Sequence, residues 1–165
     1  MKKLIFYFAS VLLSTLPAQA VPNFASRNIQ GLNVNVPQGW QVESDHYSIQ
    51  LFAEPSNEDA PTMGLIAATA NQSMTITPAQ VSAMVIQQIQ AAAPTTQMQL
   101  VDQNDNGTAL YQLHQLTEGS NIGYMSSYTY TDQGSGSMVY VFFTALAQDF
   151  VHLGGHALPL VAFGG

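Results

Sequence analysis

Apolar and polar residues alternate along residues 46–53, so that Tyr47, Ile49 and Leu51 share one side of the segment. This period of two is typical of a β-strand with one buried face. Residues 138–146, MVYVFFTAL, are nearly all apolar, which predicts a central strand covered on both faces. Five further strands are predicted, at 32–40 (where Pro37 ends the strand), 63–70, 96–103, 108–116 and 121–131.

A helix is predicted to follow the third strand. Thr77 can cap it, Pro78 suits its first position, and Gln80 completes a capping box. Pro94 sets its end. One apolar stripe with helical spacing comprises Val81, Met84, Val85, Ile89 and Ala92.

A second helix is predicted over 149–161, although the glycines at 154–155 and Pro159 weaken it. Residues 21–31 are interpreted as an irregular lead. The element order is therefore three strands, a helix, four strands and a helix. This order predicts an α+β fold, with a mostly antiparallel sheet of about six or seven strands covered by two helices.

Residues 1–20 have the pattern of a secretory signal peptide. Two lysines precede the apolar run LIFYFASVLLSTL, and the small residues Ala18 and Ala20 mark a cleavage site. We expect cleavage after Ala20 and one α/β sandwich domain over 21–165. An N-terminal membrane anchor is the alternative, but the apolar run is short for a bilayer. The sequence has no cysteine, so the protein is not a lipoprotein, and we expect it in the periplasm or outside the cell.

The charge balance narrows the classes of partner. After cleavage, Arg27 is the one lysine or arginine left against ten acidic residues. Such a chain repels nucleic-acid phosphates and anionic membrane surfaces, so we expect it to bind neither. The acidity also keeps an exported protein soluble.

Two segments resemble the PsbP-like α/β sandwich family. They are VNVPQGW at 34–40 and MVYVFFTALAQDF at 138–150, the latter leading from a late apolar strand into the final helix. The resemblance implies an α/β/α sandwich and a non-enzymatic binding or assembly role. It assigns no functional residue, because no site motif of the family is matched.

One stretch has the letters of a calcium loop. Asp102, Asn104, Asn106 and Gly107 match the first half of that motif, but Leu113 stands at position 12, where a bidentate Glu is required. The flanking segments also have the pattern of strands. We therefore predict a β-hairpin turning at Asn-Gly, with a weak calcium site as the alternative.

A second candidate site is in DFVHLGGH. Asp149, His152 and His156 would share one face of an unbroken helix, and neutral imidazoles with a carboxylate suit Zn or Cu. His46 or His114 would supply a third nitrogen only if the fold brought it near. A polar outer helix face explains the same residues, and this interpretation is preferred. We expect no cofactor.

Tyr124, Tyr128 and Tyr130 alternate along one predicted strand. Such a row is either an exposed stacking platform or part of the core with its hydroxyls at the rim, and the core interpretation is preferred.

These observations predict an exported, non-catalytic binding or accessory protein of the bacterial envelope or extracellular space, acting through a protein partner. Two alternatives remain open. One is a secreted metal-dependent hydrolase using His152 and His156. The other is a secreted effector or toxin-neutralising (immunity) protein, which differs from the first prediction only in its partner.

Overall fold

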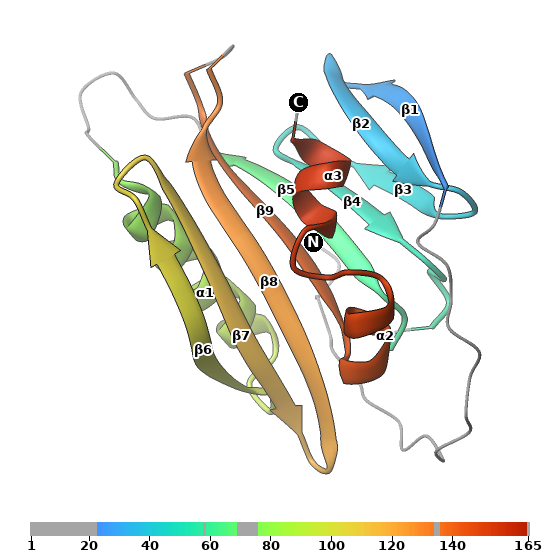
Figure 1. The fold of residues 1–165 in the computed structure, drawn as a ribbon, viewed down its shortest axis with the longest axis vertical. Coiled ribbons are helices and arrows are strands. Elements are labelled where there is room, and N and C mark those ends of the chain that lie inside the picture. The colour runs from blue at the N-terminus through green and yellow to red at the C-terminus, as the bar shows by residue number, and fades with distance from the viewer. Residues whose placement is uncertain (1–22, 58, 69–75, 134–135, 165) are drawn as a thin grey trace.

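A computed structural model describes residues 23–57, 59–68, 76–133 and 136–164 (Figure 1). The predicted signal peptide, 1–20, lies outside them. The largest element is an antiparallel sheet in the spatial order β3-β4-β5-β9-β8-β7-β6, which confirms the predicted fold class. Its strands are β3 (Gln41–Ser44), β4 (Ser48–Phe52), β5 (Thr62–Ala68), β6 (Gln97–Asp105), β7 (Ala109–Glu118), β8 (Asn121–Thr131) and β9 (Met138–Leu146).

Strand β9 lies at the centre of this sheet, between β5 and β8, and is buried on both faces as predicted. Its side chains alternate between two cores. Tyr140 and Phe142 pack on the side of the first helix, whereas Val141 and Phe143 pack on the opposite side. The uninterrupted apolar run is therefore explained by the position of β9 between two covering layers.

Helix α1 (Pro78–Ala92) covers one face of the sheet. The predicted capping box is confirmed: Thr77 Oγ1 accepts from the Gln80 N–H, and Gln80 Oε1 accepts from the Thr77 N–H at 2.9 Å. The predicted stripe needs one correction, because Met84 is 53% exposed while Ser82 is buried. The helix thus turns Val81, Val85 and Ile89 toward the sheet together with Ser82.

A β-hairpin of β1 (Phe24–Ile29) and β2 (Leu32–Pro37) covers part of the other face. Residues 24–29 were predicted to be irregular, and that prediction is wrong. Gln30 and Gly31 both have positive φ, at 53° and 85°, which closes a two-residue turn between the strands. Val34 and Val36 of β2 enter the core.

The rest of that face is covered by two short helices, α2 (Ala147–His152) and α3 (Leu158–Phe163). They replace the single helix predicted over 149–161. The helix is interrupted at two glycines. Gly154 has φ +66°, and a Cβ at Gly155 would lie 2.6 Å from the Phe150 ring. Figure 1 shows α2 and α3 in front of the sheet and α1 behind it. Within the described residues, no helix is long and apolar enough to cross a membrane.

Candidate functional site

The stretch with the letters of a calcium loop forms the end of β6 and a tight turn into β7, which confirms the predicted hairpin. Asn106 Oδ1 accepts hydrogen bonds from the backbone N–H groups of Thr108 (3.0 Å) and Ala109 (2.7 Å). Asp105 Oδ1 accepts from the N–H of Gly107 at 2.8 Å. The side-chain oxygen of Asn106, one of the three expected calcium ligands, is therefore already bonded within the turn.

A β-bulge in β6 sets the side on which Asp102 lies. The pairing with β7 shifts between Leu100, which lies opposite His114, and Asp102, which lies opposite Leu113. Consecutive residues of β7 point to opposite faces, so Leu100 and Asp102 do as well. Leu113 belongs to the core under α2 and α3. Asp102 therefore shares that face of the sheet with Tyr111.

Three residues on this face form a tyrosine–histidine cluster: Tyr111 of β7, Tyr128 of β8 and His156 of the turn between α2 and α3. The Tyr111 hydroxyl lies 2.8 Å from Nδ1 of His156, and the Tyr128 hydroxyl donates to the carbonyl of His156 at 2.7 Å. The two tyrosine rings pack with their centroids 4.9 Å apart. The cluster fixes the chain between α2 and α3 against the sheet.

The electrostatics of the cluster keep both phenols neutral. Burial raises the pKa of Tyr111 to about 12, and the nearby Tyr128 and the charge of Asp102 add to the rise. Burial also raises the pKa of Tyr128. At neutral pH the hydroxyls are therefore hydrogen-bonding groups rather than bases. This chemistry suits positioning and recognition, because a general base works best with a pKa near the operating pH.

The tyrosine row of β8 packs against the core under α2 and α3, as the preferred interpretation expects. Tyr124 contacts Phe150 with ring centroids 5.5 Å apart. Tyr130 donates to the carbonyl of Phe163 at 3.5 Å. Between these tyrosines, the Ser126 hydroxyl donates to the carbonyl of Gly155. Hydroxyl groups on this face of β8 thus donate hydrogen bonds to backbone carbonyls of the C-terminal segment.

The predicted metal ligands are only partly brought together. Asp149 and His152 lie on α2, where burial raises the pKa of Asp149 and the charge of His152 opposes that rise. The helix ends at His152, and His156 lies beyond it with Nδ1 at Tyr111. His114 is buried on the α1 side of the sheet. Among the described residues, no group of three or more His, Asp or Glu is placed to hold a metal ion. The metal site stays a prediction.

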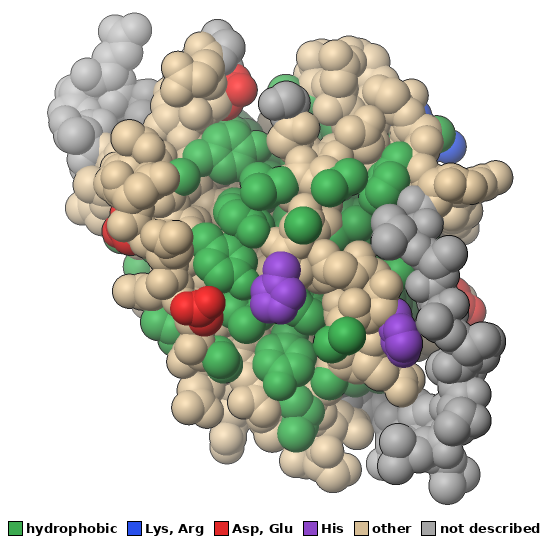
Figure 2. Space-filling view, in the orientation of Figure 1, with side chains coloured by type: hydrophobic (Ala, Val, Ile, Leu, Met, Phe, Trp, Pro, Cys, Tyr) green, Lys and Arg blue, Asp and Glu red, His purple; other side chains and the backbone are tan. Residues whose placement is uncertain are grey.

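Apolar side chains are exposed around the two short helices, and we call this surface the apolar face. Val151 of α2 is 74% exposed, Val161 of α3 is 43% exposed, and Leu160 of α3 and Ile122 of β8 are also exposed. Figure 2 shows hydrophobic side chains gathered across the middle of this side of the molecule, with histidine among them. Exposed apolar groups that gather on one side are typical of binding surfaces.

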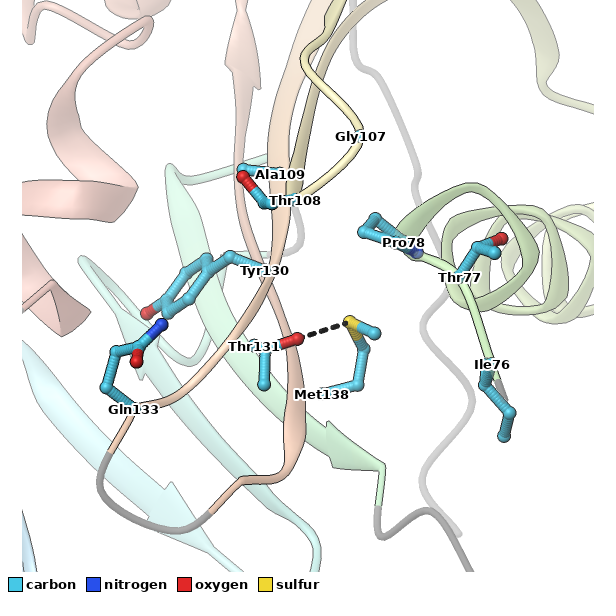
Figure 3. A pocket seen from close by; sticks show the side chains of 10 residues that line it. All are labelled: Ile76, Thr77, Pro78, Gly107, Thr108, Ala109, Tyr130, Thr131, Gln133 and Met138. Atoms are coloured by element: carbon cyan, nitrogen blue, oxygen red, sulfur yellow. Dashed lines mark hydrogen bonds between the residues drawn. The ribbon is translucent and has the colours of Figure 1, made fainter. Parts of the chain in front are cut away.

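A pocket of about 470 Å³ opens on another part of the surface, between the start of α1, the β6–β7 turn and the ends of β8 and β9 (Figure 3). Its apolar walls include Ile76, Pro78 and Met138, and its polar lining residues are Thr77, Thr108, Tyr130, Thr131 and Gln133. No carboxylate or imidazole is among its lining residues. The pocket therefore offers no acid–base pair or nucleophile with an adjacent base.

The seven-stranded antiparallel sheet with helices on both faces is an α+β sandwich. Solved structures with a similar fold were found by comparison with known proteins. No family model and no curated protein matches the chain. The structure is similar to the Ran-binding protein Mog1p of Saccharomyces cerevisiae, with a TM-score of 0.60 and 8% identity over 86% of this chain and 93% of that one. It is also similar to a Mog1 point mutant, with a TM-score of 0.56 and 10% identity over 84% and 90%.

A third structure, the protein of unknown function PA94 from Pseudomonas aeruginosa, gives a TM-score of 0.42 with 12% identity over 79% of this chain and 88% of that one. At these identities the comparisons show the fold alone. The resemblance to the PsbP-like family stays a prediction from the sequence.

The sequence did not indicate that Tyr111 belongs to the tyrosine–histidine cluster, and it suggested Asp102 as a ligand of a calcium loop instead. Tyr111 stands in a strand pattern with no signal that marks its partner, because His156 is 45 positions away. No glycine or proline near Leu100 indicates the bulge in the sequence. The row at Tyr124 to Tyr130 was the one visible sign that this face carries aromatic side chains.

Proposed function

We propose that the protein is an exported, non-catalytic binding or accessory protein of the bacterial envelope or extracellular space, and that it binds a protein partner through the apolar face. The observation that supports this most is the exposure of Val151, Leu160 and Val161 on two consecutive short helices. Burying such side chains against a partner contributes about 25 cal/mol per Å² of apolar surface, which must exceed the entropic cost of association.

The surroundings of the apolar face suit a protein rather than a small substrate. The neighbouring tyrosines Tyr111, Tyr124 and Tyr128 are half-buried and already fixed by the core. Tyrosine is enriched in protein interfaces because its ring and hydroxyl contribute contact area at a low entropic cost. Mog1p, which has a similar fold, is described as a Ran-binding protein.

Export rests on residues 1–20 alone. A charged start, an apolar run and small residues before the expected cut are the pattern of a secretory signal. The acidic composition after Ala20 supports a partner that is neutral or cationic, and it disfavours nucleic acid and anionic membrane surfaces. N-terminal sequencing of the mature protein tests the cleavage site directly.

The binding proposal is tested with a photo-crosslinking residue placed at Val151 in the full chain, expressed in a bacterial host that exports it. The matched control carries the same residue at Met84, which is 53% exposed on the opposite side of the molecule. We expect a discrete crosslinked protein from position 151 that is absent from position 84. With the crosslinking residue kept at position 151, Val161→Glu on the apolar face should weaken capture and Met84→Glu should not. Equal crosslinking from both positions would contradict the proposal.

The two alternative functions, a metal-dependent hydrolase and an effector or immunity protein, predict different results for the same purified protein. A metal-dependent hydrolase requires stoichiometric Zn or Cu after mild purification, lost in the His152→Ala/His156→Ala double variant. Such a result would overturn the non-catalytic proposal. An effector or immunity protein would capture a toxin or a host protein, so the identity of the crosslinked partner separates it from an envelope accessory protein.

A further inference from the structure

Strand β6 forms one edge of the seven-stranded sheet. Eight of its nine residues pair with β7 along one side, and among the described strands none pairs with the other side. An edge strand presents a row of backbone N–H and C=O groups to the solvent, which is a template for another extended chain. Strand β6, with nine residues, is long enough to pair with an extended peptide.

The usual means of blocking such an edge are weak in β6. The strand contains no proline and no lysine. Leu100 and Val101 are 45% and 53% exposed. Two blocking features are present. One is the pair of carboxylates of Asp102 and Asp105, and the other is the bulge between Leu100 and Asp102, which leaves four paired residues on its N-terminal side and four on the other. Each half is long enough for a short run of strand pairing.

The charge of the edge selects the kind of chain that fits. Asp102 and Asp105 lie on β6, and both are exposed. Among the described residues, Arg27 is the one lysine or arginine, and it lies on β1 in the separate two-stranded sheet. No lysine or arginine of the main sheet therefore neutralises the two carboxylates, and a cationic ligand meets no like-charged side chain there.

Aromatic side chains extend the same surface. Asp102 and Asn104 share the face of Tyr111, whose ring packs on Tyr128. A lysine or arginine side chain that points to this face from an added strand lies beside the Asp102 carboxylate, whereas Tyr111 lies one strand further in, on β7.

We propose that β6 binds an extended, cationic segment of the protein partner by strand addition, with Asp102 and Asp105 selecting the positive charge. This inference rests on the proposed function, because it names where and how part of a protein partner docks. A second copy of this chain is a poor occupant, since pairing of β6 with itself brings four carboxylates together with no lysine or arginine from either strand.

The test uses the full mature protein and a fluorescent peptide of alternating lysine and valine. Two comparison peptides replace lysine by glutamate or carry N-methyl groups at alternate residues. We expect saturable binding of the cationic peptide and none of the other two. The isosteric Asp102→Asn/Asp105→Asn variant should bind about fivefold more weakly, the loss expected for two exposed ion pairs. The matched variant Glu43→Gln/Glu54→Gln removes the same charge elsewhere and should bind normally.

Amide hydrogen exchange locates the bound peptide. We expect exchange to slow for residues 97–105 and to stay unchanged in β3, the opposite edge of the sheet. Equal binding of the N-methylated peptide, or slowed exchange confined to other strands, would overturn the inference. Self-association of the protein with protection at β6 would overturn it in favour of a second copy.

The two proposals fail in distinguishable ways. If the partner crosslinked at position 151 binds equally well to Asp102→Asn/Asp105→Asn, the protein-binding function stands and strand addition at β6 is wrong. If position 151 captures nothing while the cationic peptide still protects β6, the apolar face is wrong and the edge site stands.

Discussion

The hydroxyl of Tyr111 lies 2.8 Å from Nδ1 of His156, and this contact joins strand β7 to the turn between α2 and α3. Tyr128 fixes the same residue from β8 through its backbone carbonyl. Two neighbouring strands therefore hold one turn, at the point where Gly154 and Gly155 prevent a continuous helix. The orientation of the apolar face depends on this attachment, because Val151 and Leu160 lie on the helices that flank the turn.

Tyr111→Phe should loosen that turn without disturbing the sheet. Loss of one hydrogen bond lowers the free energy of unfolding by about 1 kcal/mol. We expect faster amide exchange at 153–157, measured by NMR, with little change in the central strand β9. Tyr47→Phe is the control, because Tyr47 is 67% exposed. An unchanged turn in Tyr111→Phe would mean that Tyr128 and the core are sufficient to hold it.

His114 should make the protein sensitive to acid. Its Nδ1 is buried with no hydrogen-bond partner among the described residues, and its neighbours across β6 and β8 are Leu100 and Met125. Burial lowers the pKa of His114 below the value near 6.5 of an unfolded chain. Its contribution is thus fully present above about pH 6.5 and is lost as the pH falls through the lowered pKa, because the unfolded chain binds the proton first.

Urea unfolding at about pH 7.5 and about pH 5 measures this effect. Part of the stability lost at the lower pH should be restored by His114→Leu, which places an apolar side chain between two others. His46→Gln should retain the whole acid sensitivity, since His46 is exposed. A pH dependence equal in wild type and His114→Leu would assign the acid sensitivity to other groups.

The features that sequence predicted well depend on nearby residues. The capping box of Thr77 and Gln80 is complete within one helical turn, and Asn106 closes the hairpin by accepting hydrogen bonds from Thr108 and Ala109. The uninterrupted apolar run of β9 indicates burial on both faces even when the neighbouring strands are not known. Such signals are local, so one sequence is sufficient to find them.

The features that it missed depend on partners far away or on polar strands. Strand β3 holds one apolar residue, Val42, and forms because β4 pairs with it. Strand β1 needed a turn in which Gln30 takes positive φ, a conformation that glutamine seldom adopts. Asp102 faces Tyr111 because of a bulge that has no sequence signature. The candidate site consists largely of such long-range contacts.

Thr129→Val should stabilise the protein. Thr129 is 1% exposed, and its hydroxyl has no hydrogen-bond partner among the described residues. Valine has the same shape and removes the buried polar atom, so we expect the free energy of unfolding to rise by about 1 kcal/mol. The control Thr129→Ser keeps the hydroxyl and loses the methyl group, and it should be less stable than wild type. A loss of stability in Thr129→Val would indicate that the hydroxyl has a bound water as its partner.

Calcium should leave the melting temperature unchanged, because Asn106, one of the three expected side-chain ligands, is already bonded within the turn. Asn106 Oδ1 accepts from two backbone N–H groups and from the Thr108 hydroxyl at 2.9 Å, and Asp105 Oδ1 accepts from Gly107. Calcium binding would have to break these bonds without the carboxylate that Leu113 replaces.

Thermal unfolding with and without millimolar calcium checks this prediction, and Asn106→Ala tests the role of the turn. The alanine variant should lose about 1 kcal/mol of stability, because two backbone N–H groups lose their acceptor. Asn106→Asp keeps an acceptor oxygen in place and should lose less. A saturable rise of the melting temperature with calcium in wild type, absent in Asp102→Ala, would show that Asp102 binds the ion and that the hairpin interpretation is incomplete.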